Sequence, residues 1–359
     1  DILRGMTIAL MILVNTPGNW QYVYSPLKHA AWHGCTPADL VFPFFLFVVG
    51  VSLAFSLAKY QNKLNKDSAW RISRRIFLIF IMGLFINSFP QWMTDYSHLR
   101  IMGVLQRIAV AYGVAAFIVL AAPRRWLPGV GAFILLAYWG ILYFFGGSDP
   151  YSLSGNATIP FDRAILGEAH LYRGFGIPFD PEGILSSLPA VATVIIGCLA
   201  GMMIAETRQN LVPLKLAPAG MVLAATGYLW GLIFPINKPL WTGSYVLYTA
   251  GLAALLFALL IYIIDVKGHK KWSLMFSVFG MNPLLLFALS SVWIKTLQHV
   301  IRIPDKTGQT ISGSAWLYQN IFVPLAGNMN GSLAYALAHI VTFWLIGFVL
   351  YRFRFFVKV

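Results

Sequence analysis

The sequence predicts an all-α polytopic membrane protein, with about ten transmembrane helices in one bundle. Of its 359 residues, 58% are hydrophobic and only 11% are charged, whereas soluble globular domains carry about 25% charged residues. The mean hydropathy is +0.72, so too little polar surface is available to solvate a soluble fold of this length. We therefore interpret residues 1–359 as a single membrane domain.

Ten apolar segments are long enough to be spans, because about 20 apolar residues cross the ~30 Å hydrocarbon core of a bilayer. The first is short, and because the chain begins at Asp1 rather than at a methionine, we expect an upstream piece to be missing. The expected spans are residues 5–20, 38–58, 76–94, 101–122, 127–146, 183–205, 216–235, 244–265, 272–297 and 333–351.

The basic residues are distributed unevenly between successive loops. Most of the 26 Lys and Arg residues fall in every second loop, including the tract 59–75, and at the chain ends. Cytoplasmic loops carry such an excess, so both termini are expected to be cytoplasmic and the long loops 17–37, 147–182 and 298–332 to lie outside. This bias explains the net charge of +14 better than nucleic-acid binding, for which no zinc-finger pattern or basic helix is present.

Residues 28–47 join a polar loop to the start of an apolar span. His29 and His33 lie in the loop, and Asp39 follows at the start of the span. An imidazole can act as a base, a nucleophile or a metal ligand near neutral pH, but no third ligand has metal-site spacing, so no metal is predicted. For His29 a catalytic role and a plain surface position both remain open, and for His33 the surface position is preferred. Asp39 can cap the helix, orient an imidazole, or do both.

Polar residues in two other expected spans extend this candidate site. Asn15 ends the first span, where it can donate a hydrogen bond to a developing oxyanion or satisfy freed helix carbonyls. Gln106 and Arg107 lie in the fourth span, with Arg107 ~10 Å deeper than Arg100 along a helix. A buried Arg must pair with an anion or with carbonyls. Arg107 is therefore expected to meet either a carboxylate such as Asp39 or part of an anionic ligand.

Two outer loops carry candidate substrate contacts. Asp180 and Glu182 precede the sixth span, where two acids can bind the cation and hydroxyls of an amino sugar or simply begin a helix around the intervening proline. Asn237, Lys238 and Trp241 lie in the next outer loop. Trp with polar neighbours suits a sugar face, although Trp also belongs to the interfacial belts of membrane proteins.

The cytoplasmic edge carries candidate contacts for an anionic ligand. Arg71, Arg74 and Arg75 share one helical face, and clustered arginines suit phosphates, the alternative being a topological anchor. Asn282 lies early in the ninth span, where it forms either a helix–helix hydrogen bond or a ligand contact. Of the two cysteines, Cys35 lies in a loop and Cys198 in a span, so we do not expect a disulfide.

Taken together, these motifs resemble the heparan-α-glucosaminide N-acetyltransferase family of membrane acyltransferases, including its bacterial members. The resemblance implies transfer of an acetyl group from cytoplasmic acetyl-CoA to the amine of a glucosamine-type sugar on the far side of a bacterial inner membrane. By likeness to the family motif, His29 is the active histidine and Asn15 its polar partner, while Gln106, Arg107, Asn237 and Asn282 line the site. The segments that carry the likeness are residues 3–15, 27–45, 100–107, 179–183, 236–245, 265–268 and 280–283.

The mechanism and the acceptor stay open at this point. His29 can carry the acetyl group as an acyl-imidazole, or it can deprotonate the sugar ammonium in a ternary complex. The loop between Asn15 and His29 departs from the family pattern, so the resemblance does not fix the natural acceptor. The expected partners are an amino sugar and the lipid bilayer, with a homodimer as one assembly to consider.

Two other functions are alternatives to this one. The first is an O-acyltransferase that modifies a hydroxyl of a surface glycan with the same donor. The second is a sugar transporter or flippase. The absence of an internal sequence repeat and the concentration of polar residues near the outer face argue against transport.

Overall fold

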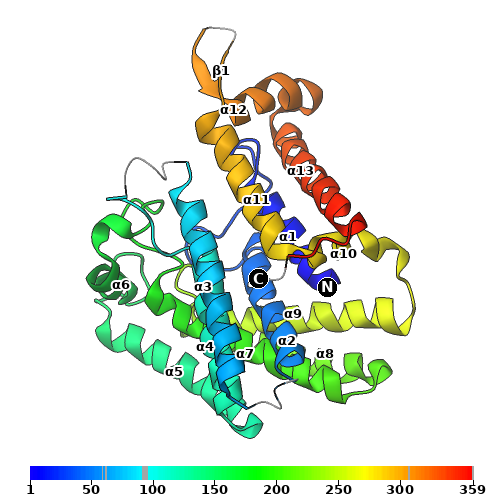
Figure 1. Cartoon of the computed structure of the whole chain (residues 1–359). Helices are drawn as coiled ribbons and strands as arrows, with labels where there is room; N and C mark the ends of the chain where they lie inside the picture. The colour runs from blue at the N-terminus through cyan, green and yellow to red at the C-terminus, as the bar shows by residue number, and fades with distance from the viewer. Residues whose placement is uncertain (59, 61–62, 91–95, 306–307, 358–359) are drawn as a thin grey trace.

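The protein is a bundle of long helices with one small β-hairpin (Figure 1). The computed structural model describes residues 1–58, 60, 63–90, 96–305 and 308–357. Within these residues, seven helices are long and apolar enough to cross a membrane, or up to eight when a helix pair bent by 74° counts as one span. This arrangement confirms the predicted class of all-α polytopic membrane protein.

The principal elements follow in chain order. They are α1 Ile2–Asn15, α2 Val41–Ala58, α3 Lys66–Ser88, α4 Val104–Ala121, α5 Leu127–Phe145, α6 Thr158–Leu166, α7 Ile184–Glu206, α8 Val212–Trp230, α9 Gly243–Ile261, α10 Leu274–Met281, α11 Pro283–Lys295, β1 Arg302–Pro304, β2 Thr310–Ser312, α12 Gly313–Leu317 and α13 Val323–Arg352. Short 3-10 or π turns extend several of them, notably Pro37–Leu40 ahead of α2.

The expected count of ten spans is not confirmed. Each expected segment overlaps a helix or the bent pair, but α1 has only 14 residues and α3 does not qualify as a span. Helix α3 starts at Lys66 rather than near residue 76, so it includes the basic turns that the prediction assigned to a loop. The end of the expected span 76–94 lies outside the described residues. The ninth expected span is broken between Met281 and Pro283, because proline lacks an N–H and clashes with the preceding turn.

Helix α2 occupies the centre of the bundle, and most of its apolar side chains are buried; 72% of the most apolar 18-residue stretch of Pro37–Ala58 is buried. Glycines bring it close to α7. A Cβ atom on Gly50 would lie 2.1 Å from the Val194 carbonyl oxygen, and one on Gly197 would lie 2.1 Å from that of Phe47. Small residues allow such close backbone approach between membrane helices. The contact fixes α2 relative to α7, and with it the turn Pro37–Leu40 that carries Asp39 ahead of α2.

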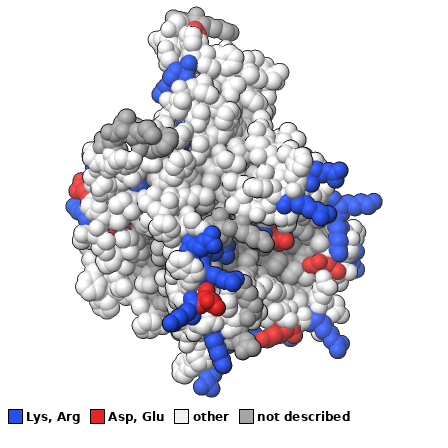
Figure 2. Space-filling model, viewed as in Figure 1, with Lys and Arg blue, Asp and Glu red and all other residues white. Residues whose placement is uncertain are grey.

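The two ends of the bundle differ in their charged residues. The basic end is formed by the last turns of α2, α4, α7 and α9 and the first turns of α3, α5 and α8, and it includes Arg71, Arg124, Arg208 and Lys267. Figure 2 shows most of the visible Lys and Arg side chains along this lower and right-hand margin. The opposite end, called the histidine end, is formed by the loops 16–40, 167–183 and 231–242. The basic loops therefore gather at one end of the bundle, and the loops that alternate with them along the sequence gather at the other end.

Two loops distant in sequence are bonded together at the histidine end. The side-chain amide of Asn237 donates to the carbonyl of Trp32 at 3.0 Å, and the N–H of Gly34 donates to the carbonyl of Ile236 at 2.7 Å. These bonds hold Lys238 beside the start of α2. The hairpin of β1 and β2, paired antiparallel, projects beyond the bundle beside α12 (Figure 1).

Candidate active site

A cavity of about 390 Å³ opens at the histidine end. Its walls come from α1, the segment ahead of α2, α4, the loop before α7, the loop before α9, and α11. Seven residues predicted from the sequence lie together in its lining: Asn15, His29, Asp39, Arg107, Glu182, Lys238 and Trp241.

His29 and Asp39 form a hydrogen-bonded pair at this cavity. Nδ1 of His29 lies 2.7 Å from Oδ1 of Asp39, and the His29 side chain is 38% exposed while the carboxylate is buried. Since a carboxylate only accepts hydrogen bonds, Nδ1 must carry the proton. The lone pair of a neutral His29 is then on Nε2, for which the described residues provide no hydrogen bond. The pair therefore presents a basic nitrogen, oriented by an acid.

The second carboxylate oxygen of Asp39 is fixed by the backbone. Oδ2 accepts hydrogen bonds from the N–H of Ala30 at 3.0 Å and from the N–H and hydroxyl of Thr36 at 3.1 and 3.0 Å. Thr36 and Asp39 thus complete a capping box at the start of the turn ahead of α2. One side chain provides both geometries expected for it, the helix cap and the partner of an imidazole.

Lys238 completes the polar cluster. Its Nζ lies 3.2 Å from Oδ1 of Asp39 and 3.1 Å from Nδ1 of His29. Because Nδ1 already carries a proton, Lys238 donates to the carboxylate. Its positive charge balances that of Asp39, as a buried membrane carboxylate requires. The side chain predicted as a sugar contact therefore lies against the histidine pair.

Arg107 lies deeper in the cavity and is fully buried. Its Nε donates to the hydroxyl of Ser187 at 3.3 Å, one terminal nitrogen contacts the hydroxyl of Ser186, and the guanidinium lies 4.9 Å from the ring centroid of Trp241. The expected ion pair with Asp39 is not formed, and no other described carboxylate pairs with Arg107; the two serines at the start of α7 contact its Nε and one terminal nitrogen instead. Its Nη1 is buried with no hydrogen-bond partner among the described residues. A donor in this state can serve an oxygen of a bound ligand.

Trp241 forms one wall beside Arg107. Its backbone has a φ of 53°, a conformation that is rare for a bulky residue and costs of order 1–3 kcal/mol. The surrounding structure holds it there, since Nε1 donates to the Thr193 hydroxyl at 3.3 Å and the ring packs edge-on against Phe42. The buried indole thereby becomes a rigid part of the cavity.

The two acids predicted to contact an amino sugar are held by Arg100. This guanidinium donates to Asp180 at 2.9 and 2.7 Å and to Glu182 at 2.5 Å, and lies 4.5 Å from the ring centroid of Tyr172. Burial lowers the pKa of Arg100, but the two carboxylates outweigh it and raise the pKa above its usual value. Arg100 and Glu182 line the cavity, whereas Asp180 is buried behind them.

Three other predicted site residues lie outside this lining. Asn237 joins the two outer loops, as described above. Asn282, at the break between α10 and α11, donates to the carbonyl of Phe355 at 2.9 Å and accepts from the N–H of Val357 at 2.8 Å. Gln106 is buried between α3 and α4, and its Nε2 has no partner among the described residues.

Arg71, Arg74 and Arg75 line a second cavity, of about 300 Å³, at the basic end. The guanidinium of Arg75 lies 4.6 Å from the ring centroid of Tyr112. Its Nε is buried without a hydrogen-bond partner among the described residues.

A small cavity of about 50 Å³ lies between the basic and histidine ends. It shares Arg75 and Tyr112 with the basic-end cavity. Its wall at Ile108 is one helical turn from Val104, which lines the cavity at His29. The three cavities therefore form a row along α4, from the arginines to the histidine.

Aromatic residues at the cavity mouth were missed by the sequence reasoning. Trp20, Tyr172 and Phe175 line the cavity, and Trp20 is 59% exposed. The only available signal was the enrichment of the outer loops in Trp and Tyr. Cys35, near the site, is no candidate nucleophile, because burial and then the charge of Asp39 raise the pKa of its thiol to about 12. Both cysteines are free.

Fold and site together define a multi-pass membrane protein with a histidine–carboxylate pair at the mouth of a cavity inside its helix bundle. The chain belongs to the heparan-alpha-glucosaminide N-acetyltransferase family, whose catalytic region matches residues 1–239. This finding confirms the resemblance seen in the sequence. The matched range contains Asn15, His29, Asp39, Arg107 and Lys238.

Two curated proteins show the same relationship. The chain is 29% identical to heparan-alpha-glucosaminide N-acetyltransferase of Homo sapiens and 28% identical to that of Mus musculus, in each case over 96% of its own length. The alignments cover 59% and 60% of the two relatives. The chain therefore spans about three fifths of the length of the curated relatives it matches.

Proposed function

We propose that this protein transfers the acetyl group of acetyl-CoA across the membrane to the amino group of a glucosamine-type sugar. Membership of an N-acetyltransferase family supports the reaction class. The observation that carries the proposal is the row of cavities along α4, which runs from the arginines of the basic end toward the His29–Asp39 pair. A donor too polar to cross lipid requires such a passage.

The basic end suits the nucleotide part of the donor. CoA carries several phosphate charges, and arginines recognise phosphates through charge-assisted hydrogen bonds. Arg71, Arg74 and Arg75 would hold these groups, and the unpartnered Nε of Arg75 supplies a buried donor. The positive-inside rule supports a cytoplasmic location for this end, and the proposal is that both termini are cytoplasmic and that the protein belongs to a bacterial inner membrane. We treat residues 1–359 as one acyltransferase domain.

The histidine end suits the transfer step. Nε2 of His29 accepts a proton from the sugar amine as its nitrogen attacks the thioester carbonyl. The carbon–sulfur bond then breaks, and the imidazolium returns the proton to the leaving thiolate. In the alternative route Nε2 itself attacks the thioester carbonyl and the CoA thiolate leaves. The neutral sugar amine then attacks the acetyl-imidazolium, which frees His29, and the proton lost by the amine neutralises the thiolate. Asp39 positions the imidazole in both routes.

The cavity also offers donors for the oxyanion of the tetrahedral intermediate. Nη1 of Arg107 and the side-chain amide of Asn15 both belong to residues of the lining. A single donor of this kind contributes roughly 3–4 kcal/mol to transition-state stabilisation. The aromatic faces of Trp20 and Tyr172 at the mouth suit the apolar face of a sugar ring.

The test is release of free CoA thiol by the purified protein with acetyl-CoA and glucosamine. His29→Ala is expected to abolish glucosamine-dependent release, because it removes the basic nitrogen, while the protein stays monodisperse. His33→Ala is the matched control and is expected to keep its turnover. Undiminished release by His29→Ala would falsify the proposal.

The choice of acceptor and a control without acetyl-CoA separate the alternatives. N-acetylglucosamine has no free amine, so turnover with it at the glucosamine rate would indicate an O-acyltransferase. Sugar flux into vesicles without acetyl-CoA would instead indicate a transporter.

A further inference from the structure

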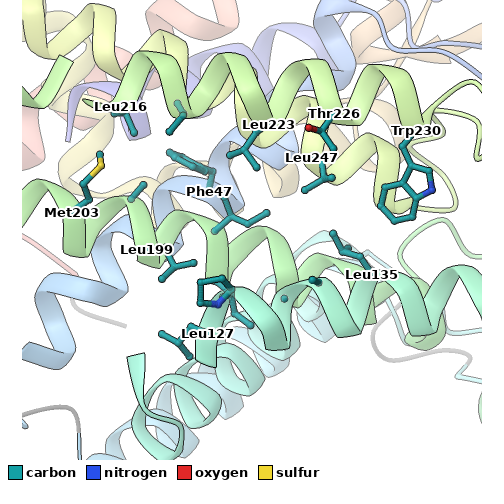
Figure 3. A pocket seen from close by; sticks show the side chains of 18 of the residues that line it. Phe47, Leu127, Leu135, Leu199, Met203, Leu216, Leu223, Thr226, Trp230 and Leu247 are labelled. Carbon is teal, nitrogen blue, oxygen red and sulfur yellow. The ribbon is translucent and has the colours of Figure 1, made fainter. Parts of the chain in front are cut away.

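A separate cavity of about 500 Å³ lies between α5, α7, α8 and α9. It shares no lining residue with the cavity at His29. Figure 3 shows side chains of α8, such as Leu223, facing those of α5 and α7 across the space. Of the residues in its lining, only Thr226 and Trp230 carry a polar side-chain atom.

The chemistry of this cavity favours an apolar occupant. Apolar cavities of much smaller size, on the order of 150 Å³, stay dry and bind apolar ligands. If the space stayed empty, its walls would lose dispersion contacts over their whole length. A hydrocarbon chain restores those contacts without leaving a polar group unsatisfied.

The cavity is reachable from the bilayer. The helices α5 and α8 are peripheral, since only 33% and 22% of the residues in their most apolar 18-residue stretches are buried within the bundle. Helix α5 packs on α7 whereas α8 packs on α9, so the cavity lies between two helices that face lipid. Leu136, in its lining, is 55% exposed. A lipid chain can therefore enter sideways from the hydrocarbon layer.

The length of the cavity suits a chain from one leaflet. From Leu216 to Trp230 the axis of α8 advances roughly 21 Å at 1.5 Å per residue. Along α7 the lining runs from Ile195 to Met203, roughly 12 Å. These lengths bracket the ~15 Å thickness of half a hydrocarbon core.

Three cations lie close in sequence to the residues at one end of the cavity. Leu127 and Leu216 line that end. Arg125 lies two residues before Leu127, Lys215 immediately precedes Leu216, and Arg208 follows the end of α7. Among the described residues, none of these three cations is paired with a carboxylate, since nearby Glu206 is bonded to Arg124. Phosphate is the lipid group that such a cluster attracts.

We propose that this groove binds one anionic phospholipid. Its acyl chain occupies the cavity between α5 and α8, and its phosphate lies at the cluster of Arg125, Arg208 and Lys215. The groove thereby joins a lipid of the basic-end leaflet to the helices α7 and α9, at a distance from the acetyl-transfer cavity.

The first test fills the cavity and measures lipid binding by native mass spectrometry of the delipidated protein. Gly131 lines the cavity, and a Cβ there would meet only Ile195, at 3.9 Å, so Gly131→Leu places its side chain in the open space. We expect affinity for added phosphatidylglycerol to fall about tenfold, the effect of displacing roughly two methylenes from apolar surroundings. Gly129→Leu is the matched control on the same helix, since a Cβ there meets nothing within 4 Å and Gly129 is outside the lining.

The second test addresses the headgroup. Arg125→Gln combined with Arg208→Gln is expected to weaken phosphatidylglycerol binding about 25-fold, roughly fivefold for each of the two charges, while Lys267→Gln with Lys270→Gln leaves it unchanged. Zwitterionic phosphatidylcholine is expected to bind the wild-type protein weakly. Equal binding of the two lipids, or undiminished binding by Gly131→Leu, overturns the proposal. A wild-type dimer that dissociates in Gly131→Leu also overturns it, because the groove is then an interface between two copies of the chain.

Discussion

At the residue scale, the environment of Asp39 decides what His29 can do. One carboxylate oxygen closes the capping box and the other meets Nδ1 of His29 and Nζ of Lys238. The cap fixes the carboxylate to the backbone, so the imidazole is oriented by a group that cannot swing away. Lys238 supplies the compensating charge that allows this buried acid to stay ionised.

We predict that Asp39→Asn lowers turnover by a factor on the order of 10²–10⁴, whereas the stability of the folded protein changes much less. Asparagine keeps the size and a capping oxygen, but its neutral amide neither enforces the Nδ1–H tautomer nor stabilises the imidazolium. The measurement is kcat for glucosamine-dependent thiol release across a pH series. Asp149→Asn, which changes an exposed acid of the same end, is the control. If Asp39→Asn retained the wild-type rate and pH profile, Asp39 would be only a helix cap.

The sequence predicted several residues of the candidate site, but not their hydrogen-bond partners. Asn15, His29 and Asp39 were selected because each lies at the polar mouth of an apolar span, and the structure brings all three to one cavity. The partners of Arg107 could not be predicted, since Ser186 and Ser187 are ordinary helix residues until α7 packs on α4. The same holds for Lys238, whose position depends on the bonds between two outer loops.

At the element scale, helix existence was easier to predict than helix limits. Apolarity locates the apolar part of α3 but not its start, because the basic turns from Lys66 to Arg75 are helical and yet polar. The break at Asn282 could be read as a Pro-induced kink, but the bonds from Asn282 to residues near the C-terminus involve a distant segment. Long-range contacts of this kind leave no local pattern.

At the element scale, an acid of α6 also contacts the start of α7. Oδ1 of Asp162, on α6, accepts a hydrogen bond from the N–H of Leu185 at 3.1 Å. Burial raises the pKa of Asp162 from 3.8 to about 6, although the Leu185 bond opposes this. The folded state therefore binds an additional proton between these values, so the free energy of unfolding falls as pH rises through this window and is constant above it.

We expect Asp162→Asn to remove this dependence, which amounts to at most about 3 kcal/mol. The measurement is thermal unfolding in detergent at pH values from about 4 to 7. In the wild-type protein the contribution of Asp162 lowers the melting temperature toward pH 6, whereas the variant lacks this component. The exposed Asp149→Asn variant controls for general charge effects. An identical pH response in wild type and Asp162→Asn would contradict the assignment.

At the scale of the whole molecule, the row of cavities along α4 extends from the basic end of the bundle toward the histidine end. The alternation of loop charge predicted which helix ends would gather at the basic end, because that alternation follows from crossing the bilayer repeatedly. It could not predict the cavities, which arise where side chains of α2, α3, α4 and α11 fail to fill the space between them. Arg75 is the residue at which the basic-end cavity meets the inner one.

Arg75 is therefore expected to contribute to binding of the donor. If its unpartnered Nε contacts a phosphate of the donor, Arg75→Gln removes a charge-assisted hydrogen bond worth roughly 1.5–3 kcal/mol. KM for acetyl-CoA should rise by about tenfold or more, while KM for glucosamine and kcat at saturating donor stay near wild type.

Raised ionic strength should weaken donor binding in the wild-type protein more than in Arg75→Gln, because one of the screened charges is already absent in the variant. Lys270→Gln is the matched control, since it removes a cation from the basic end but not from the cavity lining. A change confined to KM for glucosamine would show instead that Arg75 acts on the acceptor through the structure of α3 and α4, and the basic-end cavity would then lose its role as the entrance for the donor.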